Sequence, residues 1–150
     1  MAHNASQRLQ RLEDERAIID RLYEYVHSMD HGPQARLRDC FTEDRSVEGR
    51  WQGVVEQRSS GRPSWPWKQV PNTKHLVSCP RVISLDGQIA DVESYWMYIT
   101  EDGGSPQIQS FGRYLDRMRK GRDGKWRIWL RVVDSEGRNE ERRKRASAPL

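Results

Sequence analysis

The N-terminal part of the sequence has the periodicity of an amphipathic helix. From Gln7 to Met29, apolar residues recur at spacings of three, four and seven, as side chains on one face of an α-helix do. They are Leu12, Ile18, Ile19, Leu22, Tyr25, Val26 and Met29. Gly32-Pro33 ends this helix, and it starts a short second helix that ends near Phe41, because proline suits a first helical turn.

The second half of the sequence predicts strands. One or two short strands in Ser46–Val55 precede a meander of four longer ones, the first two of which are joined by a hairpin at Asp86-Gly87. The four are Thr73–Leu85, Gln88–Thr100, Gln107–Arg119 and Lys125–Asp134. Helices followed by such a meander predict an α+β fold. We expect the long helix to pack in a strongly curved antiparallel sheet, which makes a cone with an internal pocket.

The last predicted strand has large apolar residues on both faces. Strict alternation places Trp126, Ile128, Leu130 and Val132 on one face, and Arg127, Trp129, Arg131 and Val133 on the other. One layer of helix covers only one face of a sheet. A large apolar patch on the other face marks an interface, so we expect a homo-oligomer, a dimer or a trimer.

The segment Arg58–Asn72 is rich in proline and tryptophan. Its prolines forbid a regular helix or a central strand, so we predict a loop. One interpretation is a stiff cover over the pocket that places Trp65 or Trp67 against a ligand. The other is a loop that only patches the edge of the sheet.

Length and composition indicate one soluble domain. The 150 residues are too few for two good cores, and no apolar run approaches the roughly 20 residues of a membrane helix. We expect a domain over 1–136 and a basic, disordered tail over 137–150. The tail has five basic and two acidic residues and holds most of the net charge of +4, so the body is nearly neutral. Cys40 and Cys79 are isolated, and no secretion signal follows Met1, which favours the cytoplasm.

Four segments of the sequence resemble a known family. They are "AIIDRLYEYVHSMDHG" (17–32), "TKHLVS" (73–78), "IADVESYW" (89–96) and "FGRYLDRMRKGRDGKWRIWLRVVD" (111–134). In this order and at these separations they resemble the SnoaL-like branch of the nuclear transport factor 2-like superfamily, which includes scytalone dehydratase and bile-acid dehydratase. The resemblance is more specific for the fold than for the reaction, because this fold also serves isomerases, non-catalytic subunits and binding modules.

The resemblance implies a catalytic pair. Asp30 and His75 match the carboxylate and the histidine of the dehydratase members. A neutral imidazole has the right basicity to take a proton from carbon, and a carboxylate on its other nitrogen fixes the tautomer. Tyr25 matches an active-site tyrosine whose hydroxyl stabilises developing negative charge. In the structural interpretation of the same residues, Asp30 only ends a helix, His75 is a half-buried strand residue, and Tyr25 belongs to the core.

Other residues have both a functional and a structural interpretation. Five aromatic residues are candidate pocket walls, although aromatic residues on strands are often plain core. They are Trp65, Trp67, Trp96, Tyr98 and Tyr114. His27 and His31 have a metal-binding spacing, but Gly32-Pro33 breaks the helix there, so we expect no metal and no cofactor.

The basic residues of the strands do not indicate a nucleic-acid surface. They are Arg113, Arg117, Arg127 and Arg131. We expect them to pair across the sheet with acidic residues such as Glu93 or Asp116. With a nearly neutral body and no membrane segment, the partner that we expect is a small molecule.

These observations favour a metal-free lyase of the dehydratase type. His75 is its expected base and acid, Asp30 orients that histidine, and Tyr25 assists. The expected substrate is a small, largely apolar, aromatic or alicyclic compound. The alternative is a non-catalytic small subunit or a small-ligand-binding module resembling the small subunits of ring-hydroxylating dioxygenases.

Overall fold

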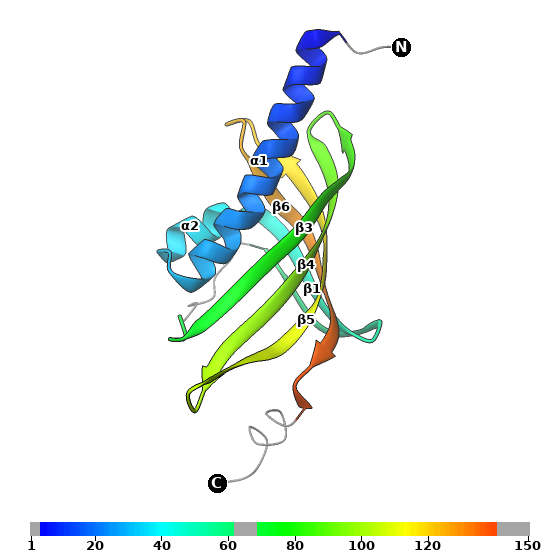
Figure 1. Ribbon diagram of the computed structural model, residues 1–150. Helices are drawn as coiled ribbons and strands as arrows, with labels where there is room; N and C mark the ends of the chain where they lie inside the picture. Colours follow the sequence, from blue (N-terminus) through cyan, green and yellow to red (C-terminus); the bar gives the residue numbers. More distant parts are fainter. Residues whose placement is uncertain (1–3, 62–68, 141–150) are drawn as a thin grey trace.

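A computed structural model describes residues 4–61 and 69–140. Its elements are α1 (Ala5–Asp30), α2 (Gln34–Asp39), β1 (Phe41–Trp51), β2 (Val54–Ser60), β3 (Thr73–Asp86), β4 (Ile89–Asp102), β5 (Ser105–Lys120) and β6 (Trp126–Arg138). Helix α1 lies along one side of a curved sheet, and α2 lies beside the C-terminal end of α1 (Figure 1). The predicted α+β fold with a long N-terminal helix is confirmed.

The strands form one mixed sheet in the order β2-β1-β6-β5-β4-β3. The predicted meander from β3 to β6 is confirmed, and each of its neighbouring pairs is antiparallel. Strand β1, in contrast, pairs parallel with β6, so the sheet is not wholly antiparallel. The sheet does not close, because β2 and β3 remain its two edges.

The core lies between α1 and the inner face of the sheet. Ile18 and Leu22 of α1 are fully buried and belong to one cluster with residues of the sheet and of α2. Burial of each such side chain stabilises the fold by roughly 1.5–3 kcal/mol. Leu12, which we expected on the buried stripe, is 63% exposed. Asp14, two residues later, is buried, so Leu12 lies on the side of α1 that faces away from the sheet.

Both ends of α1 are fixed by local chemistry. At the N-terminus, the side chain of Asn4 accepts a hydrogen bond from the backbone of Gln7, and the side chain of Gln7 accepts one from the backbone of Asn4. At the C-terminus, a Cβ on Gly32 would lie only 2.7 Å from the Cα of Ser28. Glycine therefore lets the chain turn sharply after α1, which leaves Asp30 at the helix end.

A bulge in β6 changes which side chains face the core. Met118 of β5 pairs with Ile128, but Arg117 pairs with Leu130, so Trp129 is an extra residue. Beyond it the alternation is inverted. Our prediction that Leu130 shares the inner face with Ile128 was wrong, since Leu130 is 36% exposed and Arg131 is buried at 2%.

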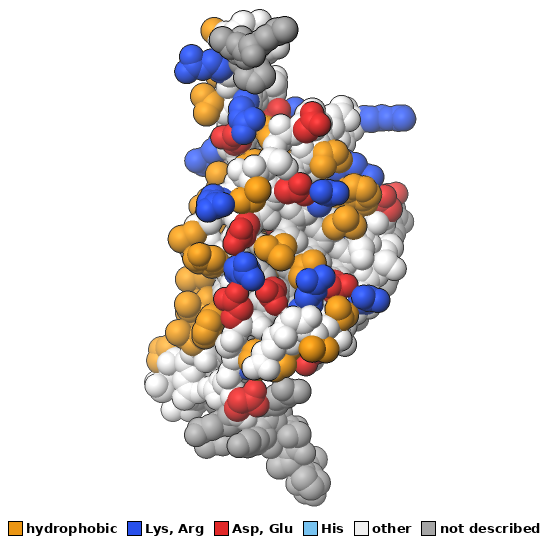
Figure 2. All heavy atoms as spheres, turned by 90° about the vertical axis from the view of Figure 1, so that its right-hand side faces the viewer, with side chains coloured by type: hydrophobic (Ala, Val, Ile, Leu, Met, Phe, Trp, Pro, Cys, Tyr) orange, Lys and Arg blue, Asp and Glu red, His pale blue; other side chains and the backbone are white. Residues whose placement is uncertain are grey.

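The outer face of the sheet combines apolar side chains with ion pairs. Leu76, Tyr95 and Phe111 are large exposed apolar residues on it. The predicted pairing of Arg113 with Glu93 is present at 3.6 Å, and Arg113 also contacts Asp134 at 3.1 Å. Figure 2 shows apolar side chains interspersed with acidic and basic ones.

Two further expectations concern the thiols and the membrane. Cys40 is buried and Cys79 is exposed, and both are free thiols. Within the described ranges, no helix has both the length and the hydropathy that crossing a membrane requires.

Candidate active site

Asp30 holds His75 at two points. One carboxylate oxygen, Oδ1, lies 2.6 Å from the ring Nδ1 of His75, and the other, Oδ2, accepts the backbone N–H of the same residue at 2.9 Å. Asp30 ends α1 and His75 is the third residue of β3, so the pair joins the helix to the edge of the sheet. Only 5% of the Asp30 side chain and 15% of the His75 side chain are exposed.

This contact selects one tautomer of the imidazole. An ionised carboxylate only accepts hydrogen bonds, so Nδ1 of His75 must carry the proton that it donates to Asp30. In the neutral ring, Nε2 then has a lone pair and is the basic atom. The pair therefore has the arrangement of a general base with its orienting carboxylate.

Strand pairing positions the ring of His75. Tyr98 is the cross-strand partner of His75 in β4, and the two rings stack with centroids 4.7 Å apart. The neighbouring residue, Lys74, lies within 2.9 Å of Nε2 of His31, just beyond the end of α1. Contacts on both sides of the strand thus fix its first residues against the helix end.

The expectation that His27 and His31 do not hold a metal ion concerns this same region. The neighbour of the His31 ring is the amino group of Lys74. Among residues 4–61 and 69–140, no group of three or more histidine, cysteine, aspartate or glutamate side chains is arranged to hold a metal ion.

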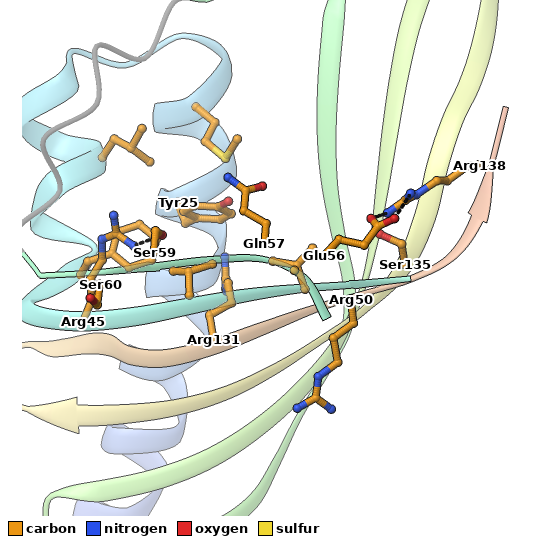
Figure 3. A pocket seen from close by; sticks show the side chains of 16 residues that line it. Tyr25, Arg45, Arg50, Glu56, Gln57, Ser59, Ser60, Arg131, Ser135 and Arg138 are labelled. Carbon is orange, nitrogen blue, oxygen red and sulfur yellow. Dashed lines mark hydrogen bonds and ion pairs between the residues drawn. The ribbon is translucent and has the colours of Figure 1, made fainter. Parts of the chain in front are cut away.

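A cavity of about 770 Å³ lies against the last turns of α1. Tyr25 and Met29 of α1 line it together with residues of α2, β1, β2 and β6 (Figure 3). Neither Asp30 nor His75 is among the described lining residues, and Met29, which directly precedes Asp30, is the lining residue nearest to the pair in the sequence. The volume suits a small organic ligand of one to a few rings.

Aromatic side chains form a layer around Tyr25. Its ring meets the edges of Phe41 and Tyr114 at centroid distances of 5.7 and 6.1 Å, and Tyr114 stacks on Trp96 at 5.8 Å. Burial raises the pKa of Tyr114 well above its ordinary value, and a hydrogen bond with Tyr25 adds to this effect. Tyr114 is therefore a neutral hydroxyl at physiological pH.

The predicted pocket walls separate into three groups. Trp96 and Tyr114 lie in the aromatic layer around Tyr25 and are not among the described residues that line the cavity. Tyr98 lies against His75. Trp65 and Trp67 lie outside the described residues, and so does the middle of the segment expected to cover the pocket.

Arg131 is a site residue that the sequence reasoning missed. Its guanidinium lies over the rings of Tyr25 and Tyr114, 4.3 and 3.9 Å from their centroids, and makes two 2.7 Å hydrogen bonds to Asp116. Burial alone would lower the pKa of Arg131, but the charge of Asp116 outweighs it and raises the pKa. The pairing with Asp116 was predicted, but on the wrong face, because nothing in the sequence marks the bulge at Trp129.

Arg45 was missed as well. It is only 2% exposed, lines the cavity from β1, and its Nη1 donates to the Ser59 hydroxyl at 3.2 Å. Its guanidinium also lies 5.4 Å from the centroid of Phe41. The predicted strand began at Ser46, so no periodic signal included Arg45.

Comparison with known proteins identifies the fold and the family. The family model described as the SnoaL-like domain matches residues 10–132. No curated protein matches the sequence closely enough to count as a relative.

Solved structures from Novosphingobium aromaticivorans are similar to this chain. An NTF2-like protein with a cystatin-like fold matches with a TM-score of 0.77, 18% identity and 94% coverage of each chain. A protein provisionally described as a scytalone dehydratase matches with a TM-score of 0.67 and 20% identity, over 86% of this chain and 88% of that one. A protein provisionally described as the β subunit of an aromatic-ring-hydroxylating dioxygenase matches with a TM-score of 0.70 and 15% identity, over 86% of this chain and 93% of that one. At such identities the likeness shows the fold alone.

Proposed function

The chain belongs to the SnoaL-like domain family, and on this premise we propose that it is a metal-free lyase of the dehydratase type. The observation that carries the proposal is the two-point contact of Asp30 with the ring and the backbone of His75. A residue that only ends a helix has no need to fix an imidazole in one tautomer. The similar fold of the protein provisionally described as a scytalone dehydratase supports the same reaction class.

The proposed reaction is an elimination of water. Nε2 of His75 takes a proton from the carbon next to a carbonyl group, and the electrons of that C–H bond form an enolate. The enolate collapses to a carbon–carbon double bond as the C–O bond to the β-hydroxyl breaks. The imidazolium returns its proton to the leaving hydroxyl, so one water molecule is released and no oxidant or reductant is needed. Asp30 stabilises the imidazolium between the two steps.

Tyr25 is the proposed electrophilic helper. Its ring lines the cavity, and it lies within electrostatic reach of the guanidinium groups of both Arg45 and Arg131. A hydroxyl in such a positive environment stabilises negative charge that develops on the carbonyl oxygen of the substrate. The aromatic layer favours a flat substrate, aromatic or alicyclic, and we keep Trp96, Tyr98 and Tyr114 as residues that shape its site.

The competing role is a non-catalytic subunit or a ligand-binding module. The fold of the dioxygenase β subunit supports this alternative only at the level of architecture. A subunit that serves only in assembly would not need the pair of Asp30 and His75, which is why we favour the lyase. We propose in either case that the chain self-associates through the outer face of its sheet, which exposes Tyr95 and Phe111.

An elimination assay tests the proposed function. The test compound is 3-hydroxy-1-tetralone, a bicyclic β-hydroxyketone that yields fluorescent 1-naphthol when it loses water. We expect the parent protein to form 1-naphthol, and His75→Gln to be slower by on the order of 10²–10⁴-fold. His27→Gln is the matched control, because His27 is exposed on α1 and should leave the rate unchanged. No formation of 1-naphthol above the uncatalysed rate, or equal rates with parent and His75→Gln, would overturn the proposal.

A further inference from the structure

The wall of the cavity is unusually rich in arginine. Four of its described lining residues are arginines, namely Arg45, Arg50, Arg131 and Arg138, and one, Glu56, is acidic. Arg138 pairs with Glu56 at 2.5 Å, and Arg50 contacts Glu48 of its own strand. These two arginines therefore have carboxylate partners, and they are less deeply buried than the other two. Arg45 and Arg131, each 2% exposed, are the buried cations of the cavity.

The guanidinium of Arg131 has hydrogen-bonding capacity that the protein does not use. Its Nε and Nη2 both donate to Asp116, but its Nη1 is buried and has no hydrogen-bond partner among the described residues. A buried donor without a partner costs about 1–3 kcal/mol, so such atoms in native proteins call for an explanation. Figure 3 shows the side chain extending from β6 toward the ring of Tyr25. Nη1 itself has almost no accessible surface, so an acceptor in the cavity beside Tyr25 would satisfy it after a small rotation of the guanidinium.

Arg45 approaches the same region from the neighbouring strand. Val47 pairs with Arg131 across the parallel β1–β6 ladder, and Arg45 lies two residues before Val47, on the same face of β1. Burial lowers the pKa of Arg45, which means that its surroundings disfavour the charged guanidinium. A bound anion would offset this penalty. The guanidinium of Arg45 lies 5.4 Å from the centroid of Phe41, and that of Arg131 lies 4.3 Å from the centroid of Tyr25. These two rings are 5.7 Å apart, so the two cations flank one pair of aromatic rings.

The rest of the wall determines what kind of anion fits. Met29, Leu37, Phe41, Val47 and Val133 supply apolar surface next to the two arginines. A small inorganic anion would leave this surface and most of the cavity of about 770 Å³ in contact with water. An amphipathic molecule fits both parts, with its ring on the apolar side chains and its charge on the guanidinium groups. Arginine binds carboxylates especially well, because its donors match the geometry of the two oxygens.

We propose that the cavity binds an organic carboxylate, whose carboxylate group lies against Arg45 and Arg131 and whose aromatic or alicyclic ring lies on the apolar wall. The inference rests on the proposed function for the reaction that follows binding, and it specifies the substrate class of that site. The preferred substrate of the lyase is then a carboxylated β-hydroxyketone. Its acid group holds it while His75 acts on the carbon next to its carbonyl, and a β-hydroxyketone without the acid group reacts but binds more weakly.

Binding of two matched probes tests this inference without any turnover. The probes are 2-naphthoate and 2-naphthamide, which have nearly the same size and differ in charge. They are titrated into the parent protein by calorimetry at low ionic strength. We expect 2-naphthoate to bind at least about tenfold more tightly, because hydrogen bonds to a charged group are stronger than neutral ones. Equal affinities, or tighter binding of the amide, would overturn the inference with no variant required.

Variants then locate the carboxylate. Arg45→Met removes one cation and keeps an apolar chain of similar length, so the preference for 2-naphthoate should fall by about tenfold. Arg58→Met is the matched control, because Arg58 belongs to the β1–β2 hairpin but does not line the cavity. Its preference should stay within twofold of the parent value. Equal losses in both variants would show a general effect of net charge, and would contradict a specific site.

Arg131 needs a paired substitution, because removal of its charge alone leaves Asp116 buried without its cation. The double variant Arg131→Met/Asp116→Leu removes both charges and should also lose the preference for 2-naphthoate. A folded double variant that keeps the full preference would exclude Arg131 from the site.

The His75→Ala protein separates this inference from the proposed function. It should bind 2-naphthoate with the same preference over 2-naphthamide while it has lost turnover. Preference without turnover in the parent protein would sustain the carboxylate site and reject the lyase. Turnover in the parent protein without a preference for 2-naphthoate over 2-naphthamide would sustain the lyase and reject the carboxylate site.

Discussion

Both oxygens of the Asp30 carboxylate are committed to His75, one to its ring and one to its backbone N–H. A single contact to the ring would leave the strand free to shift relative to the helix. The second contact ties the position of the ring to the end of α1, so the imidazole is oriented before any ligand enters. Such preorganisation is what general-base catalysis needs, since small displacements of a reacting group are costly.

Tyr25→Phe should lower turnover while it leaves the protein folded. The substitution removes only the hydroxyl, and the ring keeps its contacts with Phe41 and Tyr114. Loss of one donor to a developing oxyanion should reduce kcat by roughly tenfold to 10³-fold. Tyr23→Phe is the control, because Tyr23 is 40% exposed on the same helix. Steady-state kinetics and thermal unfolding check the pair, and unchanged kcat in Tyr25→Phe would remove Tyr25 from the mechanism.

The buried pair of Arg131 and Asp116 should be strongly coupled in stability. Asp116→Asn leaves a buried guanidinium without its counter-charge and should lower the free energy of unfolding by about 3–5 kcal/mol. The double variant Arg131→Met/Asp116→Leu should recover most of that loss. Asp91→Asn, in the exposed pair with Arg117, should cost less than about 1 kcal/mol. Urea unfolding measures all three, and equal losses from Asp116→Asn and Asp91→Asn would show that the buried pair has no special role.

Asp14 should make stability depend on pH in the acid range. Burial raises the pKa of Asp14, but hydrogen bonds from Lys120 and Trp126 outweigh it and leave that pKa below its ordinary value. The ionised carboxylate therefore stabilises the fold above the pKa of the unfolded chain, about 3.9, and this contribution is lost as the pH falls through the folded pKa.

Asp14→Asn should lower the free energy of unfolding by about 1–3 kcal/mol at pH 7, and by progressively less below about pH 4. Asp20→Asn is the control, since Asp20 forms an exposed pair with Arg16 and should have little effect at either pH. Urea titrations at several pH values measure both variants. A difference between parent and Asp14→Asn that stays constant down to pH 2 would contradict the assignment.

The outer face of the sheet should hold two or more copies together. A charge placed on its exposed apolar residues, as in Tyr95→Glu or Phe111→Glu, should convert the assembly to monomers because it buries an unpaired carboxylate. Leu9→Glu is the control, because Leu9 is 58% exposed on the part of α1 that extends beyond the sheet. Light scattering at micromolar concentration gives the mass of each. A monomeric parent protein would contradict the proposed interface.

The sequence alone predicted the elements that depend on interactions between residues close together in the chain. The long helix, the hairpin at Asp86-Gly87 and the meander follow from periodicity and turn residues, and they are present. Asp30 and His75 were expected to form a pair because of the family resemblance, and they lie together in the structure. Periodicity alone did not predict this contact. Neither residue has a local signal, since 45 positions separate them in the chain.

Two features could not be predicted, for physical reasons. The parallel pairing of β1 with β6 depends on contacts between distant segments, and no turn residue encodes it. The bulge at Trp129 adds one residue to an otherwise regular alternation, and it moved Arg131 from the expected outer face into the core. The position of Arg131 could therefore be seen only in the structure.

The protonation state of the His75 ring tests the central claim most directly. Two-bond ¹⁵N–¹H correlation spectra at about pH 8, where a free imidazole is neutral, show which ring nitrogen carries the proton. We predict a proton on Nδ1 and a bare Nε2 in the parent protein. In Asp30→Asn the amide can donate to Nδ1, so the proton should move to Nε2. A parent ring that carries its proton on Nε2, or a tautomer that Asp30→Asn leaves unchanged, would contradict the role of Asp30 and the assignment of His75 as the base.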